Sequence, residues 1–535
     1  MNETLNTYPY PSKRNVTIAK NGIVATSQPL AAQVGLDILK QGGNAVDAAV
    51  ATAACLTVVE PTTNGIGGDA FAIVHFNDSL FGINGSGKSP KALSFNALKE
   101  KGYDEIPRFG VIPITTPGAV KAWVDLVKRF GNLSFKDVLA PAINIAREGF
   151  PISPTIGNSW SNAFKRYKTL LNGNVFNPFF DTFTKNGTPY KAGDICVFKD
   201  HANTLEDIAN TNGESFYKGK LANQMVSFIQ KHGGYLSLDD LKTHKSLWVD
   251  PIAINYKGYD IHELPPNGQG IITLQALEML KQFEFNPEFK PTDMHYHIEA
   301  TKLAFEEGFQ EIADPDHLRK TVSKLLDPKH LKKQSEKIGQ TARMPIPSEE
   351  NFSGTVYLST ADKDGNMVSF IQSNYMGFGS GIAIPTTGIT MQNRGKDFSL
   401  DQNSPNFIEG NKRSYHTIIP GFITKDNKAI SSFGLMGGYM QPQGHLQLVL
   451  SMIDNDLNPQ AALDKPRWQW VKDNLIKVET EMPNDFIKAL KEKGHTVEIE
   501  KNSGLFGRGQ IIWRLDNGVY ICGVEKRTDS HAALY

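Results

Sequence analysis

The sequence predicts an α+β fold in which helices and antiparallel strands form a layered sandwich. Helical patterns cover residues 28–56 and most of 113–250, and short strands dominate between residues 355 and 444. Helical patterns return from residues 445 and 484. Pairs of apolar runs joined by tight turns are typical of hairpins, and therefore of antiparallel strands. These hairpins favour a sandwich over a doubly wound parallel sheet, in which helices would connect the strands.

The bulk composition excludes several classes of protein. The chain has 535 residues, with 56 basic and 56 acidic side chains, and 40% of its residues are hydrophobic. A formal net charge of zero gives no electrostatic reason to expect a nucleic-acid or anionic-membrane partner. Three cysteines, Cys55, Cys196 and Cys522, are too far apart to form a zinc site or a disulfide framework.

The sequence predicts no targeting segment and no membrane segment. Residues 1–20 are polar and lack the apolar core of a signal peptide. No stretch approaches the roughly 18 consecutive apolar residues that a membrane span needs. We therefore expect a cytoplasmic protein without a membrane partner.

The N-terminal part of the predicted sandwich contains two helices, a glycine-rich loop and a strand. The helical pattern over residues 28–56 is interrupted at Gly42-Gly43-Asn44, where a helix would end. Residues 61–69 are a glycine-rich loop, and residues 70–74 are an apolar strand. A phosphate-binding loop follows a strand and opens a helix, whereas this loop follows a helix and enters a strand. We therefore expect a tight turn against a neighbouring strand.

The middle of the chain is predicted to contain a hairpin at residues 253–263 and helices at 271–283 and 292–313. His295 and His297 on the last of these helices are two residues apart, so they would not share one helix face as metal ligands do. We therefore expect no metal and no cofactor.

A polar, lysine-rich stretch at residues 316–350 is predicted to be an exposed, flexible linker. It leads to Gly354-Thr355, where an apolar run begins. A turn at residues 362–366 and a second apolar run at 367–371 complete a predicted hairpin. A linker that enters a buried strand directly is a suitable place for chain cleavage.

Thr355 would gain both a nucleophile and a base if the chain were cut before it. The threonine hydroxyl would be the nucleophile, and the new α-amine would be the base on the same residue. Without further support, a Gly-Thr pair at a strand entrance is ordinary structure, because threonine is common in strands.

A series of short motifs runs in order along nearly the whole chain. These are Gly42-Gly43-Asn44-Ala45-Val46-Asp47-Ala48-Ala49, Gly67-Gly68, Thr116-Pro117-Gly118-Ala119-Val120, Phe216-Tyr217-Lys218-Gly219, Leu238-Asp239-Asp240-Leu241, Leu264-Pro265-Pro266, Asp314-Pro315, Thr355 with Asp362-Lys363-Asp364-Gly365-Asn366, Phe378-Gly379-Ser380-Gly381, Asp397-Phe398-Ser399, Asn411-Lys412-Arg413 and Met436-Gly437-Gly438. In this order the motifs resemble those of the gamma-glutamyltransferase family, which are self-processing N-terminal-nucleophile hydrolases.

The resemblance implies a four-layer αββα sandwich that cleaves itself before Thr355. The products would be a large fragment, residues 1–354, and a small fragment, residues 355–535. The two fragments would stay together as one folding unit, because each supplies part of the central sheets. The implied partner is a small-molecule amide substrate, and the oligomeric state is left open.

The resemblance also implies roles for individual residues. The Thr355 hydroxyl would attack the substrate amide and form an acyl-enzyme ester, which water or an amine then resolves. In the uncut chain the same hydroxyl would attack the carbonyl of Gly354. Ser373 matches a hydroxyl that hydrogen-bonds the nucleophile. Gly437 and Gly438 match the pair whose backbone N–H groups face the oxyanion. Asp397 matches the acidic residue that pairs with the substrate α-ammonium.

The chain departs from the family pattern in the substrate pocket. Ser86 stands where the family has the arginine that binds the substrate α-carboxylate, and serine cannot make that bidentate contact. The stretch 399–411 is too short for the lid loop of some members, so an open pocket is expected. The other departures are Tyr375 in place of asparagine, next to Asn374; Arg394 in place of glutamine; and His416-Thr417 in place of a serine pair.

Three functions are compatible with these residues. The first is a γ-glutamyltransferase or hydrolase that acts on γ-glutamyl amides such as glutathione. The second has the same chemistry with another acyl group, for example glutaryl, as in cephalosporin-acylase-like members, and the missing arginine favours it. Arg394 near Asp397 is the counter-argument, because it could bind the substrate carboxylate of a γ-glutamyl compound from the other side of the pocket. The third is an uncleaved, non-catalytic relative that acts as a binding protein. The retained Thr355, Ser373, Gly437 and Gly438 speak against the third.

Overall fold

The computed structural model describes residues 14–285, 290–345 and 354–535, and it confirms the predicted αββα sandwich. Two seven-stranded antiparallel sheets pack face to face at its centre. The first has the order β1 (Thr17–Ala19), β18 (Tyr520–Val524), β17 (Arg508–Arg514), β13 (Lys428–Met436), β12 (Gly421–Lys425), β9 (Tyr259–Glu263) and β8 (Ile252–Tyr256). The second has the order β19 (His531–Leu534), β2 (Gly22–Thr26), β10 (Gly354–Asp362), β11 (Met367–Tyr375), β3 (Asp69–Phe76), β4 (Ser79–Asn84) and β7 (Leu247–Val249).

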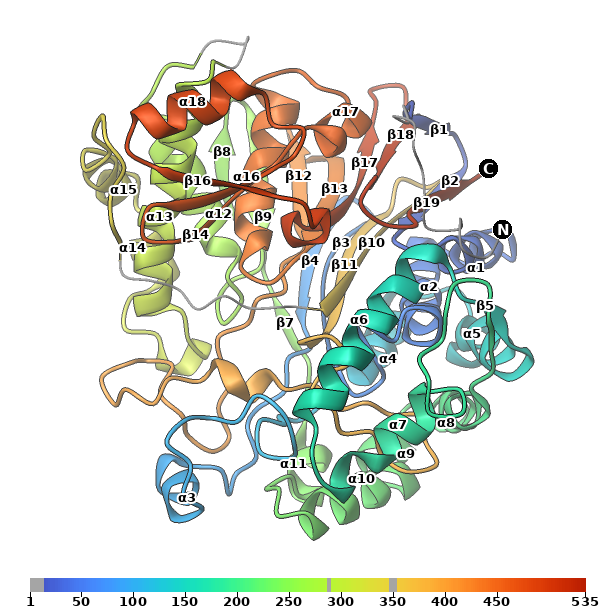
Figure 1. Cartoon of the computed structure of the whole chain (residues 1–535). Helices are drawn as coiled ribbons and strands as arrows, with labels where there is room; N and C mark the ends of the chain where they lie inside the picture. Colours follow the sequence, from blue (N-terminus) through green and yellow to red (C-terminus); the bar gives the residue numbers. More distant parts are fainter. Residues whose placement is uncertain (1–13, 286–289, 346–353) are drawn as a thin grey trace.

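Helices cover the outer face of each sheet, as Figure 1 shows. The second sheet is covered by α1 (Pro29–Lys40), α2 (Ala45–Val59) and α4 (Ala119–Phe130), with α5 (Phe135–Glu148) outside α2. The first sheet is covered by α12 (Gly270–Leu280), α16 (Met440–Ile453) and α17 (Pro459–Asp464), with α13 (Asp293–Glu311) packed on α12. Every residue of the alanine-rich α2 is buried, because small side chains let it lie between the sheet and other helices.

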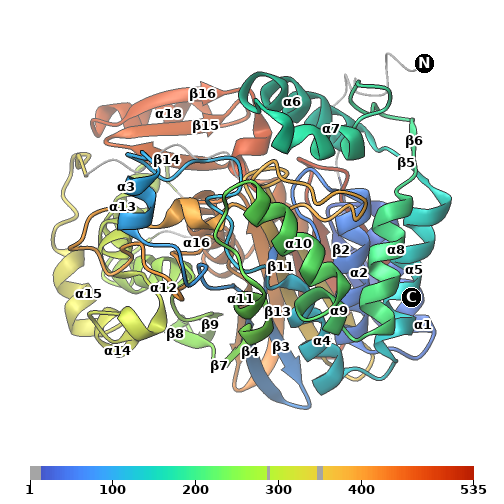
Figure 2. The same cartoon turned by 90° about the horizontal axis from the view of Figure 1, so that it is seen from below.

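Smaller elements surround this core, and Figure 2 shows α8 beside α5 at its edge. The helices are α3 (Phe95–Glu100), α6 (Pro154–Leu170), α7 (Asn177–Phe183), α8 (Lys199–Asn210), α9 (Glu214–Tyr217), α10 (Lys220–Lys231), α11 (Leu238–Thr243), α14 (Val322–Leu325), α15 (Pro328–Ser335) and α18 (Asn484–Glu492). The minor sheets are β5 (Phe150–Pro151) with β6 (Ile195–Cys196), and β14 (Trp468–Lys472) with β15 (Leu475–Glu479) and β16 (Thr496–Glu500).

The predicted hairpin at the Gly354-Thr355 step is confirmed as β10 and β11. Both strands are buried along their whole length, because β10 lies between β2 and β11 in the middle of the second sheet. The two strands pair from Ala361 and Met367 back to Gly354 and Tyr375. The strand that begins at the expected cleavage point is therefore central in the sheet.

The predicted flexible linker is wrong for its first half. Helices α14 and α15 occupy residues 322–335, and Leu325, Leu331 and Ser335 are buried there. The side chains of Leu325 and Leu331 pack in the core that includes α12, although the segment is rich in lysine. Residues 346–350 of the predicted linker lie outside the described residues.

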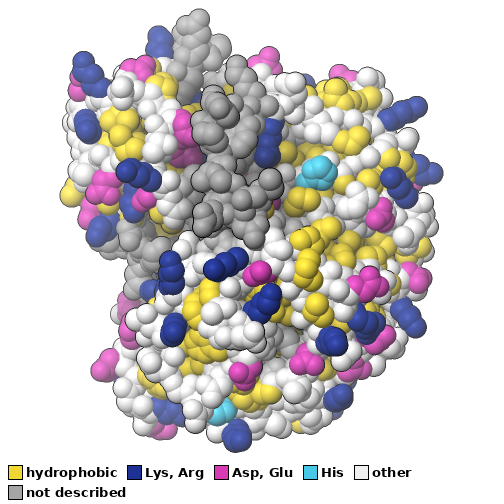
Figure 3. All heavy atoms as spheres, turned by 45° about the vertical axis from the view of Figure 1, so that its right-hand side comes forward, with side chains coloured by type: hydrophobic (Ala, Val, Ile, Leu, Met, Phe, Trp, Pro, Cys, Tyr) yellow, Lys and Arg dark blue, Asp and Glu magenta, His cyan; other side chains and the backbone are white. Residues whose placement is uncertain are grey.

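The surface carries charges of both signs. Acidic and basic side chains are interspersed on the face shown in Figure 3, in keeping with the formal net charge of zero. Among the residues that the structure describes, no helix has the length and apolar character needed to cross a membrane.

Candidate active site

The hydroxyl of Thr355 lies in a short chain of hydrogen bonds at the entrance of β10. Thr355 Oγ1 donates to Ser373 Oγ at 3.1 Å, and Ser373 Oγ donates to the carbonyl oxygen of Gly354 at 2.7 Å. The backbone N–H of Tyr375 also donates to Ser373 Oγ, at 2.7 Å. Both Thr355 and Ser373 are buried. Ser373 therefore joins the hydroxyl of Thr355 to the peptide bond that precedes it.

Gly354 has no room for a side chain. A Cβ on it would lie 2.6 Å from the backbone nitrogen of Gly377 and 3.0 Å from the Cα of Thr63. The glycine-rich loop that follows α2 is equally close to β11, because a Cβ on Gly68 would lie 2.6 Å from the carbonyl oxygen of Ser373. The predicted tight turn against a neighbouring strand is confirmed, and it holds the backbone around the Gly354-Thr355 step.

Gly437 and Gly438 follow β13 and have φ angles of +144° and +59°. Their carbonyl oxygens accept hydrogen bonds from the backbone N–H groups of Met440 and Gln441 in the first turn of α16. In a planar trans peptide the N–H points away from the preceding carbonyl, so the N–H of Gly438 points away from α16. The pair also lies at the N-terminus of α16, where the helix dipole favours negative charge.

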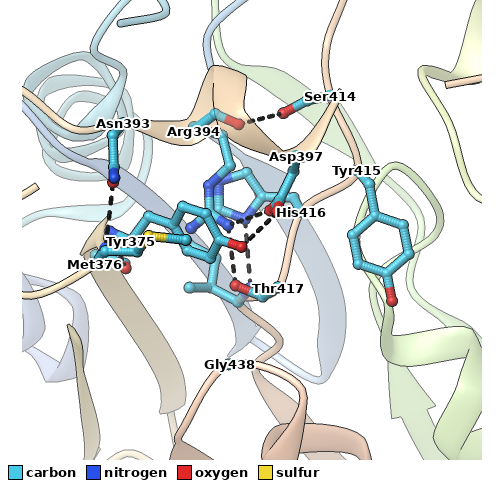
Figure 4. A network of polar contacts seen from close by, with 12 residues as sticks. Tyr375, Met376, Asn393, Arg394, Asp397, Ser414, Tyr415, His416, Thr417 and Gly438 are labelled. Carbon is cyan, nitrogen blue, oxygen red and sulfur yellow. Dashed lines mark hydrogen bonds and ion pairs between the residues drawn. The ribbon is translucent and has the colours of Figure 1, made fainter. Parts of the chain in front are cut away.

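The side chains of Tyr375, Arg394 and Asp397 form a buried cluster next to Gly438, as Figure 4 shows. Arg394 Nη1 lies 3.1 Å from Asp397 Oδ2 and 2.9 Å from Thr417 Oγ1. The Tyr375 hydroxyl donates to Asp397 Oδ1. The Arg394 guanidinium also lies 4.0 Å from the centre of the Tyr375 ring. The short helix η4 (Arg394–Asp397) supplies two of these side chains, and the end of β11 supplies the tyrosine.

Tyr375 has a φ angle of +76°, which is rare for an aromatic residue. Three contacts hold it there: its N–H to Ser373, its hydroxyl to Asp397 and its ring to Arg394. Backbone strain of this kind concentrates at functional sites. Burial, followed by the charge of Asp397, raises the pKa of Tyr375 well above its ordinary value, so the hydroxyl stays a donor.

Asp397 is a buried carboxylate with an altered pKa. Burial raises its pKa to about 6, although the Arg394 guanidinium and the Tyr375 hydroxyl lower it. The Asp397 carboxylate therefore changes charge within the pH range in which enzymes are commonly assayed.

Asp69 and His416 form a second buried pair beside this cluster. His416 Nε2 lies 3.2 Å from Asp69 Oδ2, and the Nδ1 of the same ring accepts the N–H of Ile418. Asp69 stands opposite Ser373 in the β3–β11 register and also accepts the N–H groups of Gly87 and Gly118. Burial raises the pKa of Asp69 to about 7 and lowers that of His416 well below its ordinary value. Sequence reasoning missed Asp69, because only the sheet register brings it beside Ser373.

Two predicted pocket residues lie outside the cluster. The Ser86 hydroxyl donates to Asn84 Oδ1 at 2.6 Å, and Asn267 Nδ2 lies 3.4 Å from it. The Asn374 side chain points to the other face of β11, where its Nδ2 donates to Thr390 Oγ1 at 2.8 Å. The alternation of side chains along a strand separates Asn374 from Ser373 and Tyr375.

The described residues include one group with metal-ligand chemistry, formed by His295, Glu299 and His495. His295 Nδ1 and His495 Nε2 lie 2.9 Å apart and share a hydrogen bond. The buried ammonium of Lys302 lies 2.7 Å from Glu299 Oε1 and already neutralises that carboxylate. These contacts fit a hydrogen-bonded core better than a metal site.

Comparison with known protein families gives one match that covers almost the whole chain. A model of the gamma-glutamyltranspeptidase family matches residues 31–535. The chain is 36% identical to the glutathione hydrolase-like YwrD proenzyme of Bacillus subtilis, over 96% of this chain and 98% of that protein. It is 29% identical to the oxamate amidohydrolase proenzyme of Klebsiella pneumoniae, over 97% and 99% of the two chains.

A solved structure has nearly the same fold. The crystal structure of cephalosporin acylase from Bacillus halodurans matches with a TM-score of 0.96 and 52% sequence identity. The match covers 99% of this chain and 98% of that chain.

Proposed function

This chain belongs to the gamma-glutamyltranspeptidase family, and we propose that it cuts itself before Thr355 and then uses Thr355 to cleave amides. The observation that carries the proposal is the hydrogen-bond chain from Thr355 Oγ1 through Ser373 Oγ to the carbonyl oxygen of Gly354. A hydroxyl next to a polarised carbonyl is the arrangement that nucleophilic attack needs.

In the first reaction, the Thr355 oxygen adds to the Gly354 carbonyl carbon, and the bond from that carbon to the Thr355 nitrogen breaks. The nitrogen takes up the hydroxyl proton, so an ester replaces the amide. Water then hydrolyses the ester and leaves a carboxylate on Gly354 and a free α-amine on Thr355. Ser373 donates to the carbonyl oxygen on which negative charge develops.

In the second reaction, the Thr355 oxygen attacks a substrate amide, and the new α-amine takes the hydroxyl proton. The substrate C–N bond breaks, the leaving amine takes a proton, and an acyl ester remains on Thr355. Water or an acceptor amine releases the acyl group and restores the hydroxyl. Gly437 and Gly438 donate their N–H groups to the oxyanion in this proposal, and the α16 N-terminus adds to their effect.

Cleavage would give fragments 1–354 and 355–535 that stay together. Each of the two central sheets contains strands from both sides of the Gly354-Thr355 step. In the second sheet, β10 pairs with β2 and β11 pairs with β3. Neither fragment contains all the strands of either central sheet, which supports a single folding unit.

Two acyl groups are candidates for the substrate. A γ-glutamyl amide such as glutathione is supported by Asp397 and by the name of the Bacillus subtilis relative. A different acyl group is supported by Ser86, whose hydroxyl is bound to Asn84 and cannot replace an arginine. The cephalosporin acylase structure and the oxamate amidohydrolase relative also favour this second candidate. Oxamate is an acid amide with a carboxylate and no ammonium group.

A denaturing gel and an amide assay test the proposal together. We expect purified wild-type protein to convert from one band to two, and Thr355→Ala to remain one band. The N-terminal residue of the smaller band should be Thr355. Cleaved protein should hydrolyse an acyl 4-nitroanilide, with release of 4-nitroaniline. A wild-type chain that stays uncut after prolonged incubation would instead fit an inert binding protein.

A further inference from the structure

Asp397 is already occupied by two side chains of the protein itself. Its Oδ1 accepts the Tyr375 hydroxyl, and its Oδ2 pairs with Arg394 Nη1. The carboxylate has a side-chain exposure of 5%, and the arginine of 2%. A substrate ammonium would need the same oxygens and would be placed beside a fixed guanidinium of like charge. In this chain the family's ammonium position is therefore closed.

Arg394 has two unused donors in the same place. Its Nε and Nη2 are buried and have no hydrogen-bond partner among the described residues. Buried donors without acceptors are rare, because each one costs free energy unless a ligand or water satisfies it. Asp397, Thr417 and the Tyr375 ring fix the guanidinium from three directions, so its remaining N–H groups point in a set direction. A planar carboxylate matches such a pair of N–H groups.

Short hydrogen-bonded links connect Arg394 to the proposed catalytic groups. Thr417, which accepts from Arg394, has its carbonyl oxygen 2.6 Å from Gln269 Nε2. The same Nε2 donates to the carbonyl oxygen of Gly438 at 2.8 Å. Tyr375 links Arg394 to Ser373: its ring packs against the Arg394 guanidinium, and its backbone N–H donates to Ser373 Oγ. Arg394 thus lies close to the proposed oxyanion pair and nucleophile, as Figure 4 shows for Gly438.

We propose that Arg394 binds a carboxylate at the far end of the acyl group, so that the substrates are monoamides of short dicarboxylic acids without an α-ammonium. This substrate class rests on the proposed function, since it describes the acyl group that Thr355 receives. Arg394 then determines the specificity of the pocket. Tyr375 positions Arg394 through its ring and, through its hydroxyl, occupies an oxygen of Asp397. The carboxylate anchor comes from η4 rather than from the segment that contains Ser86.

Three 4-nitroanilides that share the same leaving group test separately whether the enzyme recognises the substrate's ammonium group or its carboxylate. Glutaryl 4-nitroanilide is γ-glutamyl 4-nitroanilide without its ammonium group, and the methyl ester of the glutaryl compound removes the carboxylate charge. We expect wild-type kcat/KM for the glutaryl compound to exceed that for γ-glutamyl about 10-fold or more. It should exceed that for the ester about 100-fold. Equal or faster turnover of γ-glutamyl, or of the ester, would overturn the proposal.

Variants test the two roles separately. Arg394→Gln should lower kcat/KM for the glutaryl compound about 100-fold, mostly through KM, and change the ester by less than about 3-fold. Arg394→Gln/Asp397→Asn guards against misfolding from an unpaired carboxylate and should show the same loss. Lys396→Gln, on the same short helix, is the matched control and should keep the glutaryl preference.

Tyr375→Asn/Arg394→Gln frees both Asp397 oxygens and should raise the ratio of kcat/KM for the γ-glutamyl compound to that for the glutaryl compound at least about 10-fold. An unchanged ratio would contradict the closed ammonium position.

Binding of free glutarate gives a readout that does not need turnover. Glutarate should raise the Tm of the wild-type protein, and it should not raise the Tm of Arg394→Gln. A chain that remains uncut and inert, but whose Tm responds to glutarate through Arg394, would refute the proposed function and retain the carboxylate site. A cleaved chain that hydrolyses all three anilides equally would retain the function and refute the carboxylate site.

Discussion

Ser373 is the side chain that connects the hydroxyl of Thr355 to the preceding peptide bond. It accepts from Thr355 and from the N–H of Tyr375, and it donates to the Gly354 carbonyl oxygen. Because all three contacts pass through one hydroxyl, its removal affects the nucleophile and the carbonyl together. The hydroxyl is buried, so water cannot easily replace it.

We predict that Ser373→Ala slows self-cleavage about 10²- to 10³-fold, the usual effect of losing one donor to a developing oxyanion. Ser373→Thr should restore most of the rate, because it keeps the hydroxyl. Ser369→Ala in the same strand removes a buried hydroxyl bonded to Tyr357 and should leave the rate nearly unchanged. The time course of band conversion on a denaturing gel measures all three. Cleavage of Ser373→Ala at the wild-type rate would exclude this role.

Glu60 at the C-terminal end of α2 is a fully buried carboxylate. Its oxygens accept from Ser27 Oγ at 2.5 Å and from Thr63 Oγ1 at 3.2 Å. Burial raises its pKa from 4.5 to about 7, although the Ser27 hydroxyl, Arg508 and the Thr63 hydroxyl lower it. The folded chain therefore holds this proton more tightly than the unfolded chain does, so ionisation of Glu60 destabilises the fold as pH rises from about 4.5 to 7.

We predict that Glu60→Gln removes this pH-dependent penalty. The free energy of unfolding of the variant, relative to the parent, should increase between pH 4.5 and 7.5 by up to about 3 kcal/mol. Urea unfolding at both pH values, in a Thr355→Ala background that stays uncut, measures the difference. Glu148→Gln on the surface is the control and should show no such change. A difference that is constant with pH would contradict the altered pKa of Glu60.

At the scale of single elements, the β10–β11 hairpin is attached to the helical layer at its turn. Asp362 accepts the N–H groups of Ala45, Asp364 and Asn366, and its carbonyl oxygen accepts the Tyr520 hydroxyl. These bonds join the hairpin turn to the start of α2 and to β18. The Asp-Gly turn is therefore also a contact between layers.

We predict that Asp362→Ala destabilises the protein by about 2–4 kcal/mol, because several buried N–H groups lose their acceptor. Lys363→Ala, one residue further along the turn and exposed, should cost less than about 0.5 kcal/mol. Thermal unfolding of the two variants in the Thr355→Ala background gives the comparison. Equal Tm values would show that the hairpin turn does not need this carboxylate.

At the scale of the whole molecule, the proposed cut divides the chain into two fragments whose strands lie side by side in the same sheets. Both central sheets contain strands from residues 1–354 and from 355–535, and they pack face to face. The hydrophobic core between the sheets includes side chains from both sides of the cut, such as Phe71 and Tyr357. Cleavage of one peptide bond removes none of these contacts.

We predict that the two fragments co-elute after cleavage. Size-exclusion chromatography in native buffer should give a single peak that contains both bands of the denaturing gel, and separation should need denaturant. Two peaks in native buffer would contradict the single folding unit. The Thr355→Ala chain, which has no cut, provides the elution volume for comparison.

The sequence by itself determined the layered α+β fold, the β10–β11 hairpin and the likeness of Thr355 to a nucleophile. These features depend on local order along the chain, such as alternating apolar residues, an Asp-Gly turn and short motifs. The sequence also identified the departures at Ser86, Tyr375 and Arg394. Local patterns were less reliable for α14 and α15, because buried leucines within a lysine-rich segment show only once the neighbouring core is known.

Only the tertiary structure decided how the pocket side chains combine. Arg394 and Tyr375 are 19 residues apart in the sequence, yet both side chains contact Asp397. In the same way, His416 contacts Asp69, which lies far away in the sequence. Whether an aspartate faces a substrate or is already paired depends on side chains brought from separate strands and loops. The physical reason is that hydrogen bonds and ion pairs are decided by distance in space, which the order of residues does not give.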